Sequence, residues 1–372
     1  MLKTLKIQKF TCFPEAELEF SKGLNVIVGE NGTGKTQLLK LGYTALYVAS
    51  KLEATDREEE KEVRLRDGLI GIFKPSSINK FFSFHPGKGR DCVVSIELSK
   101  NEHIQFKFYV DRQFSGASIN SMISNSVSED DILNSFDEVK IDVKNKTILP
   151  IFIPAKELLS IYPGLAYEIR NRKLAFDDTY LHLADALEAQ ELQGEALKEI
   201  VNYAEKIEKI NNNICIKSNE KFFLKKLKIE QGILHEYPRI EAHLAAEGDR
   251  KIGMLSYLMR NGTLRPGASL FWDEPEANLN PKLIKKLAEV LIELSKIMQI
   301  TIATHSLFLL RELDICLKVQ GNNEAAMFTG LHPQEQGGVI CLQSTSLNEV
   351  GDIAALDASL EQSERFMKSR MS

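Results

Sequence analysis

The fold is decided by the stretch LNVIVGENGTGKTQLLKLGYTALYVASKL, which occupies residues 24–52. It opens with a run of mostly apolar residues, as a buried strand does, and it closes with apolar residues at helical spacing. Glycines lie between these two parts, where the sequence predicts a tight loop. That loop consists of Gly29, Glu30, Asn31, Gly32, Thr33, Gly34, Lys35 and Thr36. The sequence therefore predicts a strand, a glycine-rich loop and a helix in immediate succession.

The loop matches the pattern GxxxxGK[ST] in full, and each part of this pattern has a physical role in binding phosphate. The glycines let the backbone curl so that successive N–H groups point inward, and the helix that follows adds its positive end. We expect Lys35 to place its charge on the β- and γ-phosphates of a nucleotide, and the Thr36 hydroxyl to ligate Mg²⁺. A chance glycine-rich turn is the alternative, but such a turn does not require the flanking strand and helix.

Two acidic residues end a second apolar segment, SLFWDEP, at residues 269–275. The four mainly apolar residues predict a buried strand whose carboxyl end carries Asp273 and Glu274, where open α/β sheets bind ligands. In that place Asp273 would hold the Mg²⁺ shell, and Glu274 would polarise the attacking water. For two adjacent carboxylates alone, an ordinary turn before Pro275 is the alternative.

A histidine ends a third apolar strand, ITIATHS, at residues 300–306. A lone histidine at the end of a strand is more often a satisfied polar group than a catalytic one. Because His305 comes one strand–helix unit after Asp273, we take it as a candidate catalytic residue.

The first half of the chain carries β-like patterns around the glycine-rich loop. Alternating apolar and polar residues over 2–28 predict two meandering strands before the buried one. The charged residues 53–66 are expected to continue or end the first helix. Alternation returns over 92–108, and residues 115–137 are rich in Ser, Asn and Asp, so a β-rich insertion with loops is predicted.

The second half predicts helices and parallel strands. The segment TILPIFIP at residues 147–154 predicts a buried strand, the apolar stripe over 197–210 predicts the core face of a helix, and residues 213–244 predict a hairpin. From residue 251 onward helices alternate with short strands, which favours a parallel sheet covered on both faces. The expected fold class is α/β, with a mixed sheet flanked by helices, a β-rich insertion and a helical lobe.

Composition restricts the partners and the compartment. The net charge is −5 and the pI is near 5.9, so no global basic field draws the chain to nucleic acid or to an anionic membrane. The five cysteines are odd in number and lack CxxC spacing, which fits a reduced, cytoplasmic compartment and not a zinc site. The N-terminus has no apolar signal region, and no run approaches the roughly 18 apolar residues of a spanning helix, so no membrane partner is expected.

Four motifs in a fixed order resemble those of ABC-type ATPases: GENGTGKT, EGDR, FWDEPEANLNP and THS. They are similar to the Walker A, signature, Walker B with D-loop, and switch-histidine motifs of that family. The segments LKIQKF and GLNVIVGENGTGKT resemble the branch that contains RecF, SMC and OLD-like proteins, and also the bacterial AAA family ATPases of phage defence, such as PtuA-like proteins. The resemblance implies a P-loop NTPase of the ABC-ATPase type with ATP and Mg²⁺ as ligands.

In that family two protomers enclose two ATP molecules, and each P-loop faces the signature helix of the partner. The resemblance assigns signature, D-loop or switch roles to Ala246, Gly248, Asp249, Asn278, Asn280 and His305. One departure matters, since Ala246 stands where transporters have the signature serine, which weakens the likeness to transporters and implies slow hydrolysis. The glutamine-loop residue is not placed, and FIPAKE at residues 152–157 is a candidate region.

The resemblance also divides the chain and frames its function. The expected parts are an N-terminal ATPase lobe with Walker A (1–52), a β-rich insertion (53–150), a helical lobe with a hairpin (151–243) and a C-terminal ATPase lobe with the other motifs (244–372).

The first functional hypothesis is a homodimeric ATPase switch that controls a separate effector protein in a phage-defence or toxin-type system. The second is a RecF-like ATPase that clamps DNA, and the third is the nucleotide-binding subunit of a transporter. The four lysines between residues 221 and 228 could grip a DNA backbone, although a solvated hairpin face is the simpler interpretation.

Overall fold

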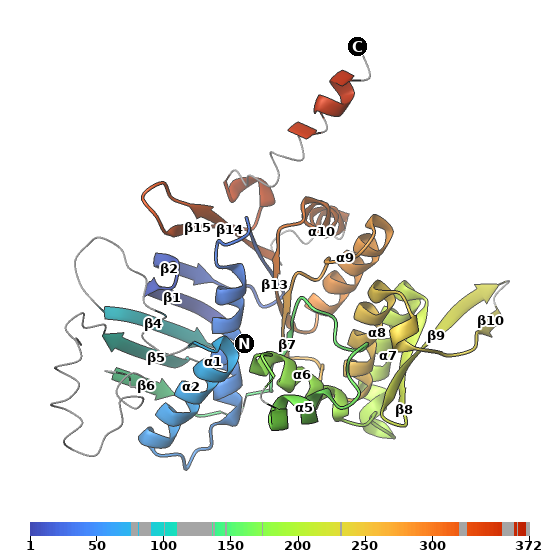
Figure 1. Cartoon of the computed structure of the whole chain (residues 1–372), viewed down its shortest axis with the longest axis horizontal. Helices are drawn as coiled ribbons and strands as arrows, with labels where there is room; N and C mark the ends of the chain where they lie inside the picture. The colour runs from blue at the N-terminus through green and yellow to red at the C-terminus, as the bar shows by residue number, and fades with distance from the viewer. Residues whose placement is uncertain are drawn as a thin grey trace. The chain divides into compact units, whose positions relative to one another are not determined.

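The computed structural model of the chain describes residues 1–75, 81, 91–99, 101–109, 136, 138–145, 147–172, 174–230, 233–319, 326–351, 361–362 and 364–369 (Figure 1). The loop expected over residues 115–137 lies outside these residues, except for residue 136. The chain divides into two compact units. Unit 1 consists of Met1–Ser21, Ile27–Ile148 and Met327–Ser372, and unit 2 consists of Lys22–Val26 and Leu149–Ala326.

Unit 1 contains a five-stranded antiparallel sheet in the order β2-β1-β4-β5-β6. Its strands are β1 (Leu2–Phe10), β2 (Phe13–Glu19), β4 (Asp91–Leu98), β5 (Glu102–Tyr109) and β6 (Glu138–Asp142). Every second side chain of β4, from Cys92 to Leu98, is buried, so one face of the sheet belongs to the core. The register places Leu5 opposite Leu18 on one side and Ile96 on the other. The strands that alternation predicts in these regions are confirmed.

Two helices of unit 1, α1 (Lys35–Lys51) and α2 (Glu58–Phe73), pack against each other. Gly68 of α2 permits this, because a Cβ there would lie 3.0 Å from the Val48 side chain. The prediction that residues 53–66 continue or end the first helix is wrong. A new helix begins because the Glu60 carboxylate accepts a hydrogen bond of 2.8 Å from the Arg57 N–H, and because the acidic first turn of α2 suits the positive end of a helix.

The strand β3 (Leu24–Gly29) begins in unit 2 and ends in unit 1, and all of its residues are buried. In unit 1 its neighbour is β14 (Ala326–Pro333), which pairs with β15 (Val339–Ser344) in antiparallel fashion. In unit 2 its neighbour is β13 (Gln299–Thr304), whose Ile300 N–H donates to the carbonyl of Gly23 at 2.8 Å. The Asn25 side chain donates to the Ile300 carbonyl at 3.2 Å, which satisfies the amide group of this buried polar residue.

Unit 2 is built on parallel strands. β12 (Ser269–Asp273) pairs in parallel with β13 on one side and with β7 (Ile151–Ile153) on the other. All residues of these three strands are buried, as expected for a parallel sheet covered on both faces. Asp273 lies opposite Ala303, and Trp272 lies opposite Ile153, so the carboxyl ends of the three strands meet at one edge.

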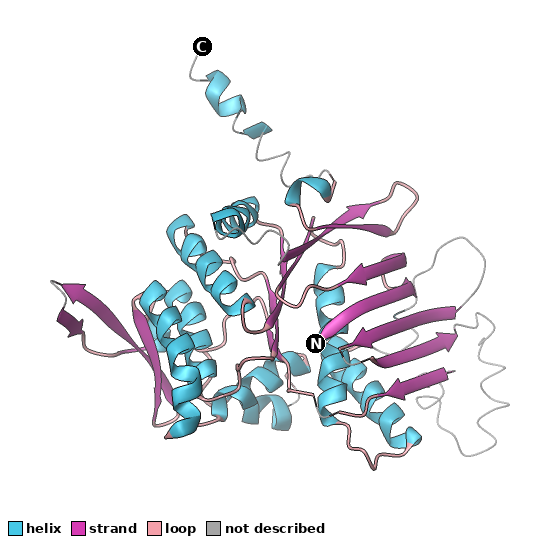
Figure 2. Cartoon of the chain, turned by 180° about the vertical axis from the view of Figure 1, so that it is seen from behind, coloured by secondary structure: helices cyan, strands magenta, loops and turns pink. Residues whose placement is uncertain are grey.

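The helices of unit 2 and a small antiparallel sheet complete this unit. The helices are α5 (Leu165–Arg172), α6 (Asp178–Glu188), α7 (Glu195–Asn211), α8 (Glu247–Arg260), α9 (Pro281–Ser295) and α10 (Leu307–Val319), and the strands are β8 (Asn213–Ser218), β9 (Lys221–Glu230), β10 (Ile233–Glu236) and β11 (Ile240–Glu241). Short 3-10 turns span Ala242–Leu244 and Leu347–Glu349, the second of them in unit 1. Figure 2 shows the hairpin of β8 and β9 beside α8. The two can pack closely because residue 253 of α8 is a glycine, and a Cβ on Gly253 would lie only 2.9 Å from the Leu224 side chain. The apolar stripe predicted for α7 is the core face, since Ile200, Ala204 and Ile207 are buried.

The expected α/β P-loop fold is confirmed. Parallel pairings in unit 2 and antiparallel pairings in unit 1 make it a mixed architecture. The glycine-rich loop follows β3, and the acidic and histidine motifs follow β12 and β13.

Candidate nucleotide-binding site

The glycine-rich loop in unit 1 has the backbone of a phosphate cradle. The strand, loop and helix follow one another as the sequence predicts, but β3 includes Gly29, and α1 begins at Lys35, within the predicted loop. Gly32 and Gly34 have φ values of +82° and +88°, a left-handed conformation that glycine adopts without strain. At Gly34 a side chain is excluded by space as well, because a Cβ would lie 2.5 Å from Cys12 Sγ and 2.8 Å from the Phe13 ring.

Lys35 extends across this loop. Its Nζ donates to the carbonyls of Gly29 at 2.9 Å and Glu30 at 2.7 Å, and the residue is only 6% exposed. The α1 N-cap, Gly34, offers no side-chain hydrogen bond, so the first N–H groups of α1 lack a side-chain cap. A cation inside a loop of backbone donors at the start of a helix fits the β- and γ-phosphates of a nucleotide. Asn31 and Thr33 lie in the turn of this loop, where the Thr33 hydroxyl donates to the Glu30 carbonyl at 2.8 Å, and Thr36 is the second residue of α1.

The acidic motif in unit 2 lies at the carboxyl ends of β12 and β13. Asp273 is the last residue of β12 and is buried, while Glu274 follows with φ of +45° and donates its N–H to the Ala303 carbonyl at 2.9 Å. Glu274 Oε1 lies 3.2 Å from His305 Nδ1, and both side chains are partly exposed. The structure therefore brings a carboxylate and a histidine into hydrogen-bond range at the place predicted for them. Oxygen donors such as Thr36 of unit 1 and Asp273 of unit 2 are of the type that Mg²⁺ prefers.

A third carboxyl group in this motif, that of Glu276, was missed from the sequence. Glu276 is 7% exposed, and its Oε1 accepts a hydrogen bond of 2.5 Å from the Thr304 hydroxyl, which itself accepts the Ser306 N–H at 3.0 Å. Burial raises the pKa of Glu276, against the opposing effect of its hydrogen bond with Thr304. The signal available in the sequence was the second glutamate of DEPE, but its partner lies 28 residues further along the chain.

Tyr180 of α6 was also missed. Burial first, and then the charges of Asp177 and Asp273, raise the pKa of Tyr180 to about 12. The phenol is therefore a neutral neighbour of the Asp273 carboxylate at ordinary pH.

The segment resembling the signature motif begins α8. Ala246 is the exposed N-cap of that helix and makes no side-chain hydrogen bond there. Gly248 is buried against the side chains of Leu279 and Leu283. A Cβ at this position would lie 2.8 Å from Leu279 and 2.5 Å from Leu283, so the close packing explains the glycine. Asp249, the third residue expected in this segment, is partly buried, and burial raises its pKa.

In unit 2 the first residues of α8 contact residues 277 and 278, which follow the acidic motif. The Asn278 side chain donates to both carboxylate oxygens of Glu247 at 3.3 Å. Lys251, which is 1% exposed, donates to the Ala277 carbonyl at 2.6 Å and lies 3.3 Å from Glu247. Asn280, in contrast, caps α9 by accepting the Leu283 N–H at 3.1 Å, so it has a structural role that the sequence did not reveal.

The loop after β7, the candidate region FIPAKE, is tied to α8. Glu157 Oε2 lies 2.7 Å from Arg250 Nε, and the two side chains are 4% and 12% exposed. Arg250 also donates to the carbonyls of Ala242 and Ala245, and Glu157 accepts the N–H groups of Leu159 and Ser160. A buried ion pair thus connects this loop with the first turn of the signature helix.

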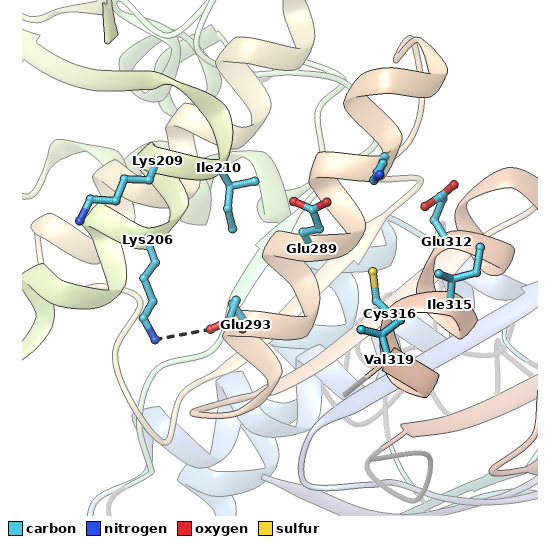
Figure 3. A pocket seen from close by; sticks show the side chains of 10 residues that line it. Lys206, Lys209, Ile210, Glu289, Glu293, Glu312, Ile315, Cys316 and Val319 are labelled. Carbon is cyan, nitrogen blue, oxygen red and sulfur yellow. Dashed lines mark ion pairs between the residues drawn. The ribbon is translucent and has the colours of Figure 1, made fainter. Parts of the chain in front are cut away.

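A separate cavity of about 820 Å³ lies between α7, α9 and α10 (Figure 3). Its side chains are Lys206, Lys209, Ile210, Lys285, Glu289, Glu293, Glu312, Ile315, Cys316 and Val319. Lys206 and Glu293 form an ion pair of 3.5 Å within it. No residue of the four motifs is among the side chains that line this cavity.

A P-loop after a buried strand, with a carboxylate and a histidine at the ends of neighbouring parallel strands, defines an ABC-type P-loop ATPase of the RecF/SMC-like kind. The chain belongs to the family described as "AAA domain, putative AbiEii toxin, Type IV TA system", whose model matches residues 24–311.

The chain is also similar to curated proteins and to solved structures. The DNA replication and repair protein RecF of Streptococcus suis (strain 05ZYH33) is 37% identical over 73 residues, which are 18% of this chain and 20% of that protein. RecF of Clostridium kluyveri is 29% identical over 106 residues, or 27% of this chain and 28% of that protein. The match thus spans about a fifth to a quarter of the length of these curated relatives. The SMC head domain from Thermotoga maritima is 13% identical with a TM-score of 0.46, covering 92% of this chain and 98% of that one.

Among the described residues, no helix is both long and apolar enough to cross a membrane.

Proposed function

We propose that this protein binds ATP with Mg²⁺, hydrolyses it slowly, and acts as a dimeric switch that controls a separate effector protein. The observation that carries hydrolysis is the 3.2 Å approach of Glu274 to His305 at the ends of two parallel strands. A carboxylate that is partly exposed and held by a histidine is suited to take a proton from an attacking water. Control of an effector rests on the likeness to defence-system ATPases and on the family description.

The proposed roles follow from the donor set. The P-loop amides and Lys35 bind the phosphates, and Thr36 and Asp273 hold the metal ion, which offsets phosphate charge when it is bound. Glu274 orients and deprotonates the water, and His305 contacts the γ-phosphate. The signature residues and Asn278 act toward the nucleotide of the partner protomer.

Glu274→Gln tests this function. The amide keeps the shape of the carboxylate but is a poor base, so ATP binding is retained, turnover falls by about 100-fold or more, and an ATP-bound dimer accumulates. Turnover is measured by phosphate release, and the dimer by light scattering with saturating Mg-ATP. Glu199→Gln, the same change at an exposed position of α7, is the control and leaves both readouts unchanged. Wild-type turnover in the Glu274→Gln variant would refute the assigned base, and a monomer at every ATP concentration would refute the dimer.

A DNA-clamping ATPase is the second candidate, favoured by the likeness to RecF. One of the hairpin lysines considered for DNA contact, Lys221, lies 3.3 Å from Glu241, which reduces its availability for phosphate. Salt-dependent binding of duplex DNA in the presence of ATP would favour this candidate over effector control.

A further inference from the structure

Glu276 occupies an unusual place for a carboxyl group. It is almost fully buried at the carboxyl end of the parallel strands, two residues after Glu274, and its Oε1 receives the Thr304 hydroxyl at 2.5 Å. Within the described part of the chain, its Oε2 is buried without a hydrogen-bond partner. Burying such a group costs free energy unless its polar atoms are hydrogen-bonded.

The Thr304 hydroxyl links this carboxyl to the switch histidine. It donates to Glu276 and accepts the Ser306 N–H at 3.0 Å, so it fixes the backbone on both sides of His305. Ser306 in turn accepts the Leu309 N–H at 3.2 Å at the start of α10, which anchors the far side of the same turn. These bonds restrain the backbone that carries His305, and the ring Nδ1 of His305 lies 3.2 Å from Glu274 Oε1.

We propose that Glu276 is a positioning residue for hydrolysis: through Thr304 it sets the place of His305 against Glu274. This inference rests on the proposed function, because it assumes that Glu274 and His305 act on ATP. A buried hydrogen bond holds its members to one geometry, and misplacement of a reacting group by about 1 Å can cost about 100-fold in rate. The amide of Glu276→Gln keeps an oxygen in the place of Oε1, which can still accept the hydrogen bond from the Thr304 hydroxyl.

Variants at both ends of the hydrogen bond test the inference. In Glu276→Ala and in Thr304→Val the bond is lost, and kcat falls about 10- to 100-fold while the Kd for Mg-ATP stays within about 2-fold. Glu276→Gln and Thr304→Ser keep an acceptor and a donor, so they retain most of the turnover. The double variant Glu276→Ala/Thr304→Val is no slower than the worse single variant, because both changes break the same link.

Thr301→Val is the matched control. Thr301 lies on the same strand β13, is 1% exposed, and its hydroxyl has no hydrogen-bond partner in the described part of the structure. The same loss of a hydroxyl there leaves kcat unchanged. A second readout does not depend on turnover: the ¹⁵N resonances of the His305 ring, assigned with His305→Ala, shift in Glu276→Ala and not in Thr301→Val.

The outcomes separate the inference from the function on which it rests. If wild type hydrolyses ATP and Glu274→Gln does not, but Glu276→Ala has normal kcat and an unshifted His305 ring, the positioning role is overturned and the function stands. If kcat falls equally in Thr301→Val and Thr304→Val, the loss comes from general damage to β13, and the positioning role of Glu276 is overturned. If Glu274→Gln hydrolyses like wild type, the proposed function fails and the inference fails with it.

Discussion

Lys35 lies inside the loop that it is expected to serve, with its ammonium group on two carbonyls of that loop. Binding of a triphosphate would replace these neutral acceptors with charged phosphate oxygens, which form stronger hydrogen bonds. Lys35→Ala removes that charge, so we expect the Kd for Mg-ATP to rise at least about 100-fold, or about 3 kcal/mol. Isothermal calorimetry measures this change, and Lys51→Ala, which removes a lysine from the other end of α1, is the control. An unchanged ATP affinity in Lys35→Ala would remove this residue from the site.

Single residues show what local sequence can and cannot predict. The glycine-rich loop could be located because its requirements are local: Gly32 and Gly34 need positive φ, and the flanking strand and helix are contiguous with them. Glu276 could not be found in this way, since its importance depends on burial and on a hydroxyl 28 residues away. Gly248 was predicted as part of a phosphate contact, whereas the packing of Leu279 and Leu283 against it is visible only in three dimensions.

Among the elements of unit 2, the loop after β7 and the helix α8 are joined by the Glu157–Arg250 pair. Arg250→Ala would leave the 4% exposed Glu157 without its cationic partner, and two carbonyls without their donor. Two backbone N–H groups still donate to Glu157 in this variant. We therefore expect the unfolding free energy to fall by about 3 kcal/mol, the low end of the range for breaking a buried ion pair. Urea denaturation measures this loss.

Two further variants give this prediction its controls. Arg265→Ala, at an exposed position, changes the unfolding free energy by less than about 0.5 kcal/mol. The double variant Glu157→Gln/Arg250→Met recovers most of the stability, because no buried charge remains unpaired. An Arg250→Ala protein as stable as wild type would mean that the pair does not hold the loop to α8.

The elements were predictable to different degrees for physical reasons. β3, β12 and β13 are fully buried, so each is a continuous apolar run that identifies itself in the sequence. The start of α2 depends on Glu60 returning to the Arg57 N–H, and Arg57 is not a usual N-cap residue, so the break after α1 was missed. The pairing of β4 with β1 joins segments about 90 residues apart, a distance over which local patterns carry no information.

At the scale of the whole molecule, Ala246 is the residue that bears on the proposed dimer, because a serine at this place would act on the nucleotide of the partner protomer. Its position at the exposed N-terminus of α8 is compatible with that role. A hydroxyl there would donate to the partner's γ-phosphate, and a hydrogen bond to a charged group contributes about 1.5–3 kcal/mol. If this bond forms mainly in the transition state, Ala246→Ser raises steady-state hydrolysis about 10-fold or more.

The structure adds a competing effect, which the experiment must separate. Ala246 is the N-cap of α8, so serine would also cap that helix and stabilise the fold by about 1 kcal/mol without any partner. Ala246→Asp caps the helix as well, but its charge repels the γ-phosphate, so we expect a higher melting temperature with no gain in hydrolysis. ATPase assays, melting curves and light scattering on the three proteins distinguish the two effects. If Ala246→Ser still dimerises with ATP but its rate equals that of wild type within error, then residues 244–249 are not the segment that meets the partner's nucleotide.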